Sequence, residues 1–289
     1  MNQKINYEMN QTYNQKSRQE VKREINLGIK QDIKQDIKQD INRDPALHDI
    51  KSAFNTIGIS LIDDQANQFF QYYQLLTEAN KVMNLTAITD FDEVVLKHFL
   101  DSVLIYCTFE KYGFKDTGDE GFKSIIDVGT GAGFPGLPLK IVFPDLHMVL
   151  LDSLNKRVGF LNDVIDKLQL EDIIAVHFRA EDAGRNAEYR DRFDLCVSRA
   201  VANLSVLSEY CLPFVRPGGL FVSYKSSDID QECEDAKKAI HMLGGKIEHV
   251  DKCFLPGTDI ERSFVFIRKE KETPPKYPRK AGTPSRSPL

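Results

Sequence analysis

The stretch Ile125–Gly136 reads IIDVGTGAGFPG, an apolar run that passes directly into a glycine-rich turn. Ile125–Val128 predicts a buried strand. Gly129, Gly131 and Gly133 let the backbone turn tightly and approach a ligand without a Cβ in the way. A helix is expected to follow, with its first amides facing the same crevice. A strand, a glycine turn and a helix in this order predict a ligand site in an α/β domain.

Beyond this stretch, short apolar runs alternate with helical stretches, which predicts a parallel, doubly wound sheet. The last two apolar runs have no helix-length segment between them, so we expect them to form an antiparallel pair at one edge. The seven expected strands are Ile125–Val128, Met148–Leu151, Ile173–Val176, Phe193–Val197, Leu220–Tyr224, Ile247–Phe254 and Ser263–Arg268.

The N-terminal part of the chain has a different character. Residues 1–44 are rich in Asn, Gln, Lys and Asp and repeat QDIK at 31–34 and 35–38. The single isoleucine stripe of these repeats cannot bury a core, so the extension is predicted to be disordered or a lone solvated helix, with a docking helix as the alternative. Residues 45–115 are predicted to form a helical subdomain, because apolar residues recur at helical spacing. These are Phe69, Phe70, Tyr73 and Leu76, then Val94, Val95, Phe99 and Val103.

The remaining boundaries follow from composition. Residues 116–268 are predicted to form the α/β domain, and residues 269–289 a basic, Pro-rich C-terminal arm. The net charge of −5 requires any nucleic-acid surface to be local. The five cysteines form no CxxC pair and no ligand-spaced cluster with His, which predicts reduced thiols and no metal. Without a signal peptide or a membrane-spanning run, we expect a cytoplasmic protein with no membrane partner.

The glycine turn alone does not identify its ligand, because Gly131, Gly133 and Gly136 also satisfy the GxGxxG pattern of dinucleotide sites. Asp127 precedes the turn, and a carboxylate there would repel a pyrophosphate but pair with the charged amino group of S-adenosyl-L-methionine. Pro217–Gly219, before the fifth strand, is a turn typical of methyltransferases. Together these features favour S-adenosylmethionine as the cofactor. An NAD-dependent oxidoreductase is the alternative.

Three further side chains are expected at the crevice. Asp152 ends the second strand, where an acid can accept both ribose hydroxyls in either class of enzyme. Glu181 follows the third strand, where an acid contacts adenine, although a stabilising acid at a helix N-terminus is an equal interpretation. Arg199 ends the fourth strand and is the candidate catalytic residue, positioning the acceptor or the cofactor. A structural salt bridge with a crevice acid is its alternative role.

The fourth strand lacks motifs that certain methyl acceptors require, which limits the possible acceptors. It carries no Asp/Asn-Pro-Pro-aromatic motif for adenine amines, and Cys196 and Cys211 are interpreted as core rather than as nucleophiles. An acceptor that is already nucleophilic, such as a purine N7, needs only to be positioned in line, without a covalent intermediate. Basic residues that could contact RNA phosphates, unless the tail merely aids solubility, are Lys156, Arg157, Lys276, Arg279 and Lys280.

Several ordered segments resemble the bacterial glucose-inhibited division protein B family, the small-subunit ribosomal RNA methyltransferases G. They are Asn84–Thr89 (NLTAIT), His98–Ser102 (HFLDS), Asp127–Pro138, Leu151–Arg157 (LDSLNKR) and Ser198–Ala200. The resemblance extends from about Pro45 to the C-terminus, and the extension before it has no counterpart in the family.

The resemblance implies a Rossmann-like class I S-adenosylmethionine methyltransferase with a mostly parallel seven-stranded sheet and a helical N-terminal segment. It implies methylation of N7 of a guanosine, position 527 in the 530 loop of 16S rRNA, with the small ribosomal subunit as partner. We expect a monomer. A non-catalytic ribosome-assembly factor with the same fold is a further alternative.

The resemblance also assigns site residues. The implied cofactor contacts are Gly129, Phe134, Asp152, Ser153, Leu154, Ala180, Glu181 and Arg199; of these, Phe134 rests on the family alone. The polar residues Asn84, Thr86, His98, Asp101 and Ser102 are interpreted as an RNA-side surface, with helix capping by Thr86 or Asp101 as the alternative.

Overall fold

The computed structural model describes residues 43–111, 122–199, 202–226 and 229–289. It divides the chain into two units, Met1–Asp49 and Ile50–Leu289. Of the first unit, residues 43–49 are described, and they are helical. The QDIK repeats and the boundary predicted between residues 115 and 116 lie outside the described residues, so the predictions made for them stay predictions.

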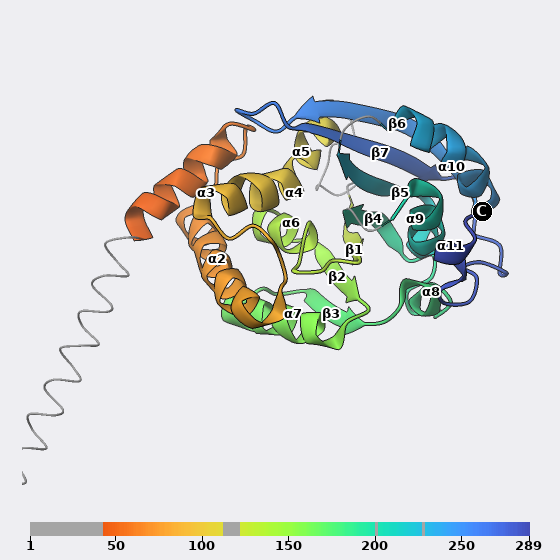
Figure 1. Ribbon diagram of the computed structural model, residues 1–289, viewed down its shortest axis with the longest axis horizontal. Coiled ribbons are helices and arrows are strands. Elements are labelled where there is room, and N and C mark those ends of the chain that lie inside the picture. Colours follow the sequence, from red (N-terminus) through yellow and green to blue (C-terminus); the bar gives the residue numbers. More distant parts are fainter. Residues whose placement is uncertain (1–42, 112–121, 200–201, 227–228) are drawn as a thin grey trace, which may run out of the picture. The chain divides into compact units, whose positions relative to one another are not determined.

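The second unit is built around one sheet with the strand order β3-β2-β1-β4-β5-β7-β6 (Figure 1). Strands β1 to β5 pair in parallel, and β7 lies antiparallel between β5 and β6. The predicted parallel sheet with an antiparallel edge pair is therefore confirmed. The strands are β1 (Ser124–Val128), β2 (His147–Asp152), β3 (Ile173–His177), β4 (Phe193–Arg199), β5 (Val215–Ser226), β6 (Gly245–Phe254) and β7 (Glu261–Lys269).

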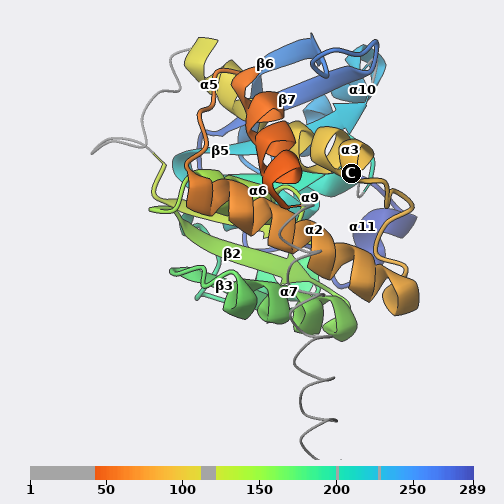
Figure 2. The ribbon, with the colours of Figure 1, turned by 90° about the vertical axis from the view of Figure 1, so that its left-hand side faces the viewer.

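Helices cover both faces of the sheet because side chains alternate along each strand. Helices α9 and α10 lie on one side of the sheet and α6 on the other (Figures 1 and 2). On β1, Ile126 and Val128 enter a core cluster with residues of α9 and α10, whereas Asp127 accepts a hydrogen bond from the start of α6. Helix α2 packs against both α6 and α7 on that second face. The helices are α2 (Asp63–Met83), α3 (Phe91–Val94), η1 (Val95–Leu100), α4 (Asp101–Val103), α5 (Ile105–Lys111), α6 (Gly136–Val142), α7 (Asn155–Lys167), α8 (Ala180–Ala183), α9 (Leu204–Cys211), η2 (Leu212–Phe214), α10 (Asp230–Met242) and α11 (Thr283–Arg286).

Helix α2 faces the core slightly differently from the prediction. Phe69 and Leu76 are fully buried as expected, but the third core position is Tyr72 rather than Tyr73. The Tyr72 hydroxyl donates a hydrogen bond to the backbone carbonyl of Ala132 at 2.5 Å, whereas Tyr73 is half-buried. This bond attaches the helical N-terminal segment to the glycine turn.

The segment after α2 is a single continuous helix that contains a π-helical turn. Its parts α3, η1 and α4 follow one another without a break, and η1 is the π-helical part. Such turns are rare and often occur at functional sites, because the extra residue redirects the side chains around it. Here η1 carries His98.

The Pro-Gly-Gly segment is a bulge inside β5 and not a turn that precedes it. Phe193 of β4 pairs with Val215, and Leu195 pairs with Leu220. Between these two pairs β5 therefore has more residues than β4, and the extra residues form the bulge. A Cβ on Gly219 would lie 2.7 Å from the carbonyl oxygen of Asp194. This close approach between strands explains why glycine occupies the position.

We predict that Gly133→Ala destabilises the protein by roughly 2–4 kcal/mol. Gly133 has φ 107°, and an added Cβ would meet Leu137 Cδ1 at 2.3 Å and the Tyr72 hydroxyl at 2.7 Å. Gly159→Ala in α7 is the matched control: its Cβ would meet nothing within 4 Å, so stability should rise by about 0.5–1 kcal/mol. Urea unfolding of both variants tests this, and equal effects would contradict it.

Candidate functional site

A cavity of about 540 Å³ lies at the carboxyl ends of β1 and β2, the position where α/β sheets bind ligands. Its wall combines the glycine turn, the helical N-terminal segment and the C-terminal arm. The lining residues are Leu85, Thr86, His98, Val128, Gly129, Thr130, Gly131, Ala132, Phe134, Leu151, Asp152, Ser153, Arg157, Phe178, Arg179, Ala180, Glu181, Arg199, Tyr210, Gly282 and Ser285.

The glycine turn forms the floor of this cavity. Gly129 and Gly131 have φ 74° and 63°, in the left-handed region that favours glycine. The amide of Gly129 donates to the carbonyl of Leu151 on β2 at 2.8 Å. A Cβ on Gly131 would meet nothing within 4 Å. The turn therefore lies against β2 and leaves open space next to its backbone.

Asp127 lies beneath the turn and is completely buried. Its Oδ2 accepts hydrogen bonds from the Thr130 hydroxyl at 2.7 Å and from the amide of Gly136, where α6 begins, at 2.8 Å. Its Oδ1 has no hydrogen-bond partner among the described residues. Burial raises the pKa of Asp127 to about 7. The carboxyl group thus shapes the turn, and its contact with a cofactor stays a prediction.

Asp152 connects the end of β2 to the same turn. Its Oδ2 accepts from the amide of Gly131 at 2.9 Å, and its Oδ1 accepts from the amide of Leu154 at 2.9 Å. Arg157 approaches Oδ2 at 3.4 Å. Each carboxylate oxygen can accept more than one hydrogen bond, so Asp152, which lines the cavity, retains capacity for ligand hydroxyls.

Phe134, His98 and Arg199 form one stacked group at the side of the cavity. The rings of His98 and Phe134 stack with centroids 4.6 Å apart, and the guanidinium carbon of Arg199 lies 4.9 Å from the Phe134 centroid. Arg199 Nη1 donates to Asp101 Oδ2 at 3.1 Å. Its predicted alternative role, a salt bridge with a nearby acid, is therefore realised while Arg199 still lines the cavity.

His98 is held as a neutral ring. Its Nε2 shares a hydrogen bond with the Thr86 hydroxyl at 2.8 Å. Burial, followed by the positive charge of Arg199, lowers the pKa of His98 to about 4. At neutral pH the ring therefore adds no charge to the cavity.

The C-terminal arm closes the cavity next to α8. The amide of Gly282 donates to Glu181 Oε1 at 2.8 Å, and Arg279 pairs with Glu209, whose side chain is fully buried, at 2.7 Å. Gly282 and Ser285 line the cavity. The sequence does not predict this position of the arm. Its only local signal is Gly282 before Thr-Pro, and in the structure Gly282 has φ 77° at the start of α11.

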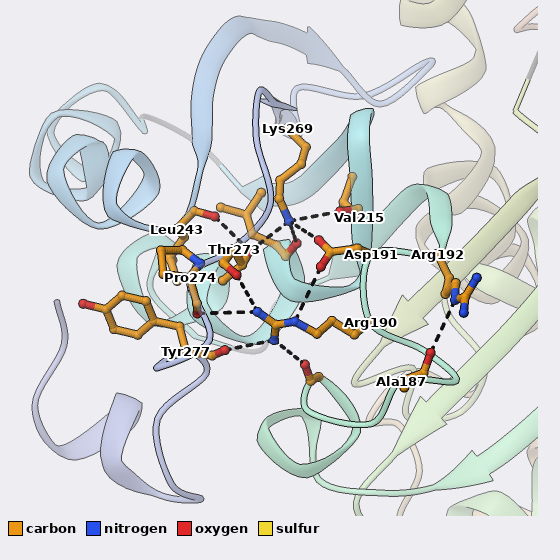
Figure 3. A network of polar contacts seen from close by, with 12 residues as sticks. Ala187, Arg190, Asp191, Arg192, Val215, Leu243, Lys269, Thr273, Pro274 and Tyr277 are labelled. Atoms are coloured by element: carbon orange, nitrogen blue, oxygen red, sulfur yellow. Dashed lines mark hydrogen bonds and ion pairs between the residues drawn. The ribbon is translucent and has the colours of Figure 1, made fainter.

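The base of the arm is anchored by a second polar network, shown in Figure 3. Lys269, at the end of β7, is completely buried and donates to Asp191 Oδ1 at 2.9 Å and to the Thr273 hydroxyl at 2.8 Å. Arg190 donates to the carbonyls of Thr273 and Tyr277 at 2.6 and 2.9 Å. These bonds hold the arm as an ordered part of the unit.

The structure brings together most of the residues predicted for the site. Those that line the cavity are Gly129, Gly131, Phe134, Asp152, Ser153, Ala180, Glu181, Arg199, His98 and Arg157. Those that do not line it are Asp127, Gly133, Leu154, Lys156, Lys276, Arg279 and Lys280. Gly133 packs against Leu137 and Tyr72, and Arg279 is occupied by Glu209. The interpretation of Asp101 and Ser102 as surface is wrong, because both side chains are buried. Asp101 accepts from Arg199, and Ser102 donates to the His98 carbonyl.

The remaining predictions concern cysteines, membranes and metals. Cys196 and Cys211 are completely buried, as interpreted. No helix within the described ranges is long and apolar enough to cross a membrane. In the same part of the chain, no group of three His, Cys, Asp or Glu side chains is arranged to hold a metal ion.

Comparisons with known proteins show the family of this chain. Residues 65–263 match the model of the family described as rRNA small subunit methyltransferase G. The ribosomal RNA small subunit methyltransferase G of Acetivibrio thermocellus is 52% identical over 80% of this chain and 92% of that protein. The Bacillus licheniformis protein of the same name is 50% identical over 80% of this chain and 94% of that protein. Among solved structures, TrmN from Thermus thermophilus matches with a TM-score of 0.43 and 14% identity, covering 61% of this chain and 53% of that chain.

The strand order and the glycine turn define a Rossmann-like methyltransferase fold. The family match covers the turn, η1 and Arg199 in one continuous range. The chain belongs to the rRNA small subunit methyltransferase G family, and its enzyme class is methyltransferase.

Ionisation of Asp127 should couple stability to pH. Because its folded-state pKa is about 7, above the ordinary 3.8, the folded protein keeps a proton that the unfolded chain releases at lower pH. The resulting stabilisation is complete below about pH 4 and is lost as the pH rises toward about 7. Urea unfolding of the ligand-free protein at about pH 5 and about pH 8 should therefore show Asp127→Asn gaining stability relative to the natural chain at the higher pH. A difference that does not change with pH would contradict this prediction.

Two neighbouring arm residues should separate stability from RNA binding. Arg279→Ala leaves the buried Glu209 carboxylate unpaired and should lower the free energy of unfolding by roughly 3 kcal/mol. It should also weaken S-adenosylhomocysteine binding, because Gly282 beside it lines the cavity. Lys280→Ala, an exposed neighbour, should leave both unchanged and lower only rRNA affinity. Calorimetric melting and titrations with S-adenosylhomocysteine and with rRNA check this. Identical behaviour of the two variants would refute it.

Proposed function

We propose that this chain transfers the methyl group of S-adenosylmethionine to N7 of a guanosine in 16S rRNA, at position 527 in the 530 loop. The observation that carries the proposal is the family match over residues 65–263, which includes the glycine turn, Arg199 and every residue that lines the first cavity except Gly282 and Ser285. The RNA of the small ribosomal subunit would be the partner and the cytoplasm the site of action. A monomeric state stays a prediction, to be checked by sedimentation.

The polar groups in and beneath the cavity suit the ribose hydroxyls and the ammonium group of S-adenosylmethionine. Asp152 presents a carboxylate for the ribose hydroxyls, and the open space beside Gly131 admits a ligand close to the backbone. Oδ1 of Asp127 is a buried acceptor that finds no partner in the described part of the chain, which suits a nearby ammonium group. When bound, the cofactor would supply a methyl group on a positively charged sulfur, with S-adenosylhomocysteine as the leaving group.

This reaction requires the protein to position the acceptor and does not require it to remove a proton. Guanine N7 carries a free lone pair, so its methylation requires no general base. Arg199 stays protonated at any physiological pH and can hold the acceptor through a phosphate or a base edge. The methyl transfer moves positive charge from sulfur to the guanine ring. A neutral His98 beside Arg199 avoids adding a further cation where that charge develops.

The test is methyl transfer from tritiated donor to 16S rRNA or 30S subunits, followed by borohydride–aniline cleavage and primer extension. We expect a cleavage stop at guanosine 527 only after treatment with active protein. RNA binding without transfer would favour the assembly-factor alternative. A melting temperature raised by NADH and not by S-adenosylhomocysteine would favour the oxidoreductase alternative.

A further inference from the structure

A second cavity, of about 630 Å³, adjoins the first. His98 and Arg199 line both cavities and form the wall between them. The second cavity extends from this wall to Lys225 and Glu232, which do not line the first cavity. Its size lies in the range of sites for small ligands, which is ample for one nucleotide.

The two cavities lie on either side of the point where the strand order reverses. The first is formed by residues from the ends of β1 and β2, and the second by residues from the ends of β4 and β5. In doubly wound sheets ligands bind in the crevice at this point. Two ligands placed in the two cavities would therefore meet at His98 and Arg199.

The charges around the second cavity suit an anionic, polar ligand. Asp101 is nearly completely buried and accepts from both Arg199, at 3.1 Å, and Arg262, at 2.6 Å. Two guanidinium groups thus share one carboxylate, and the three side chains together carry one net positive charge. Across the cavity, Lys225 donates to Glu232 Oε1 at 2.7 Å.

Glu232 retains an acceptor for a ligand. Its Oε1 is occupied by Lys225 and by the amide of Leu204. No hydrogen bond to Oε2 occurs within the described part of the chain, and the side chain is 32% exposed. A carboxylate oxygen in this state can accept from N1–H or the 2-amino group of guanine, and adenine has neither of these two donors.

We propose that the second cavity receives the target guanosine, unstacked from the RNA, with Glu232 recognising its N1–H and 2-amino edge. N7 lies on the opposite edge of the purine, so a base read by Glu232 directs N7 toward His98, Arg199 and the cofactor cavity. Extrusion of single nucleotides into such pockets is the usual way enzymes reach a base. The inference rests on the proposed function and adds to it the location and the specificity determinant of the acceptor.

The experiment measures kcat/KM for 16S rRNA carrying guanosine or inosine at the target position, because inosine lacks only the 2-amino group. The natural chain should prefer guanosine on the order of tenfold or more. Glu232→Gln should lose at least about tenfold in kcat/KM on guanosine and most of the preference, because its amide can keep the Leu204 bond but opposes the donors of guanine. S-adenosylhomocysteine affinity should not change.

Glu234→Gln is the matched control, since Glu234 lies on the same helix in an exposed pair with Lys237. It should behave as the natural chain. Ser226→Phe provides a second variant that does not disturb the core: Ser226 is exposed and lines only the second cavity, so a large ring there should block the acceptor and spare S-adenosylhomocysteine binding.

The outcomes distinguish a wrong acceptor site from a wrong proposed function. If the natural chain methylates rRNA but Glu232→Gln and Ser226→Phe match Glu234→Gln, the second cavity is not the acceptor site. If Glu232→Gln fails to fold, an unaltered rate in Ser226→Phe overturns the inference by itself. If the natural chain transfers no methyl group to rRNA, the proposed function fails first.

Discussion

The buried carboxylate of Asp101 holds the two halves of the site together. Asp101 belongs to the helix that continues η1, Arg199 ends β4, and Arg262 lies on β7, so one carboxylate joins three segments distant in sequence. A buried carboxylate is costly unless charged partners compensate it, and both guanidinium groups do so here. With this group in place, the helix that carries His98 is fixed over the carboxyl end of β4. Both cavities depend on that position.

The sheet and the glycine turn could be predicted because their signals are local. A strand buried on both faces appears as a continuous apolar run, and the seven predicted strands all occur. Their bounds differ by a few residues, except that β5 begins at Val215, five residues before the predicted start. Asp152 could be placed because parallel strands end at the same edge of the sheet. The Pro-Gly-Gly bulge of β5 was misjudged as a turn, since its shape depends on the approach of Asp194 from β4.

What the sequence did not reveal depends on contacts between distant segments. The choice between Tyr72 and Tyr73 as the buried ring was decided by the glycine turn, where Ala132 accepts the Tyr72 hydrogen bond. In the same way Arg279, in a basic and Pro-rich tail, looks like a solvated cation until Glu209 is known to lie beneath it without any exposed surface. Composition cannot show such a partner, because it is seventy residues away in the chain.

Glu181 links the C-terminal arm to the first cavity, because it lines the cavity and accepts a hydrogen bond from the arm. An adenine contact and a stabilising charge at the start of α8 are both possible from the sequence, but the structure adds a third partner, the amide of Gly282 on Oε1. Each carboxylate oxygen has further acceptor capacity, so the arm and a ligand can share this side chain. Binding that uses Glu181 would then favour the docked arm, and the docked arm would in turn keep Glu181 oriented toward the cavity. If a ligand in the cavity contacts Glu181, folding of the last residues and occupation of the cavity are therefore coupled through this one carboxylate.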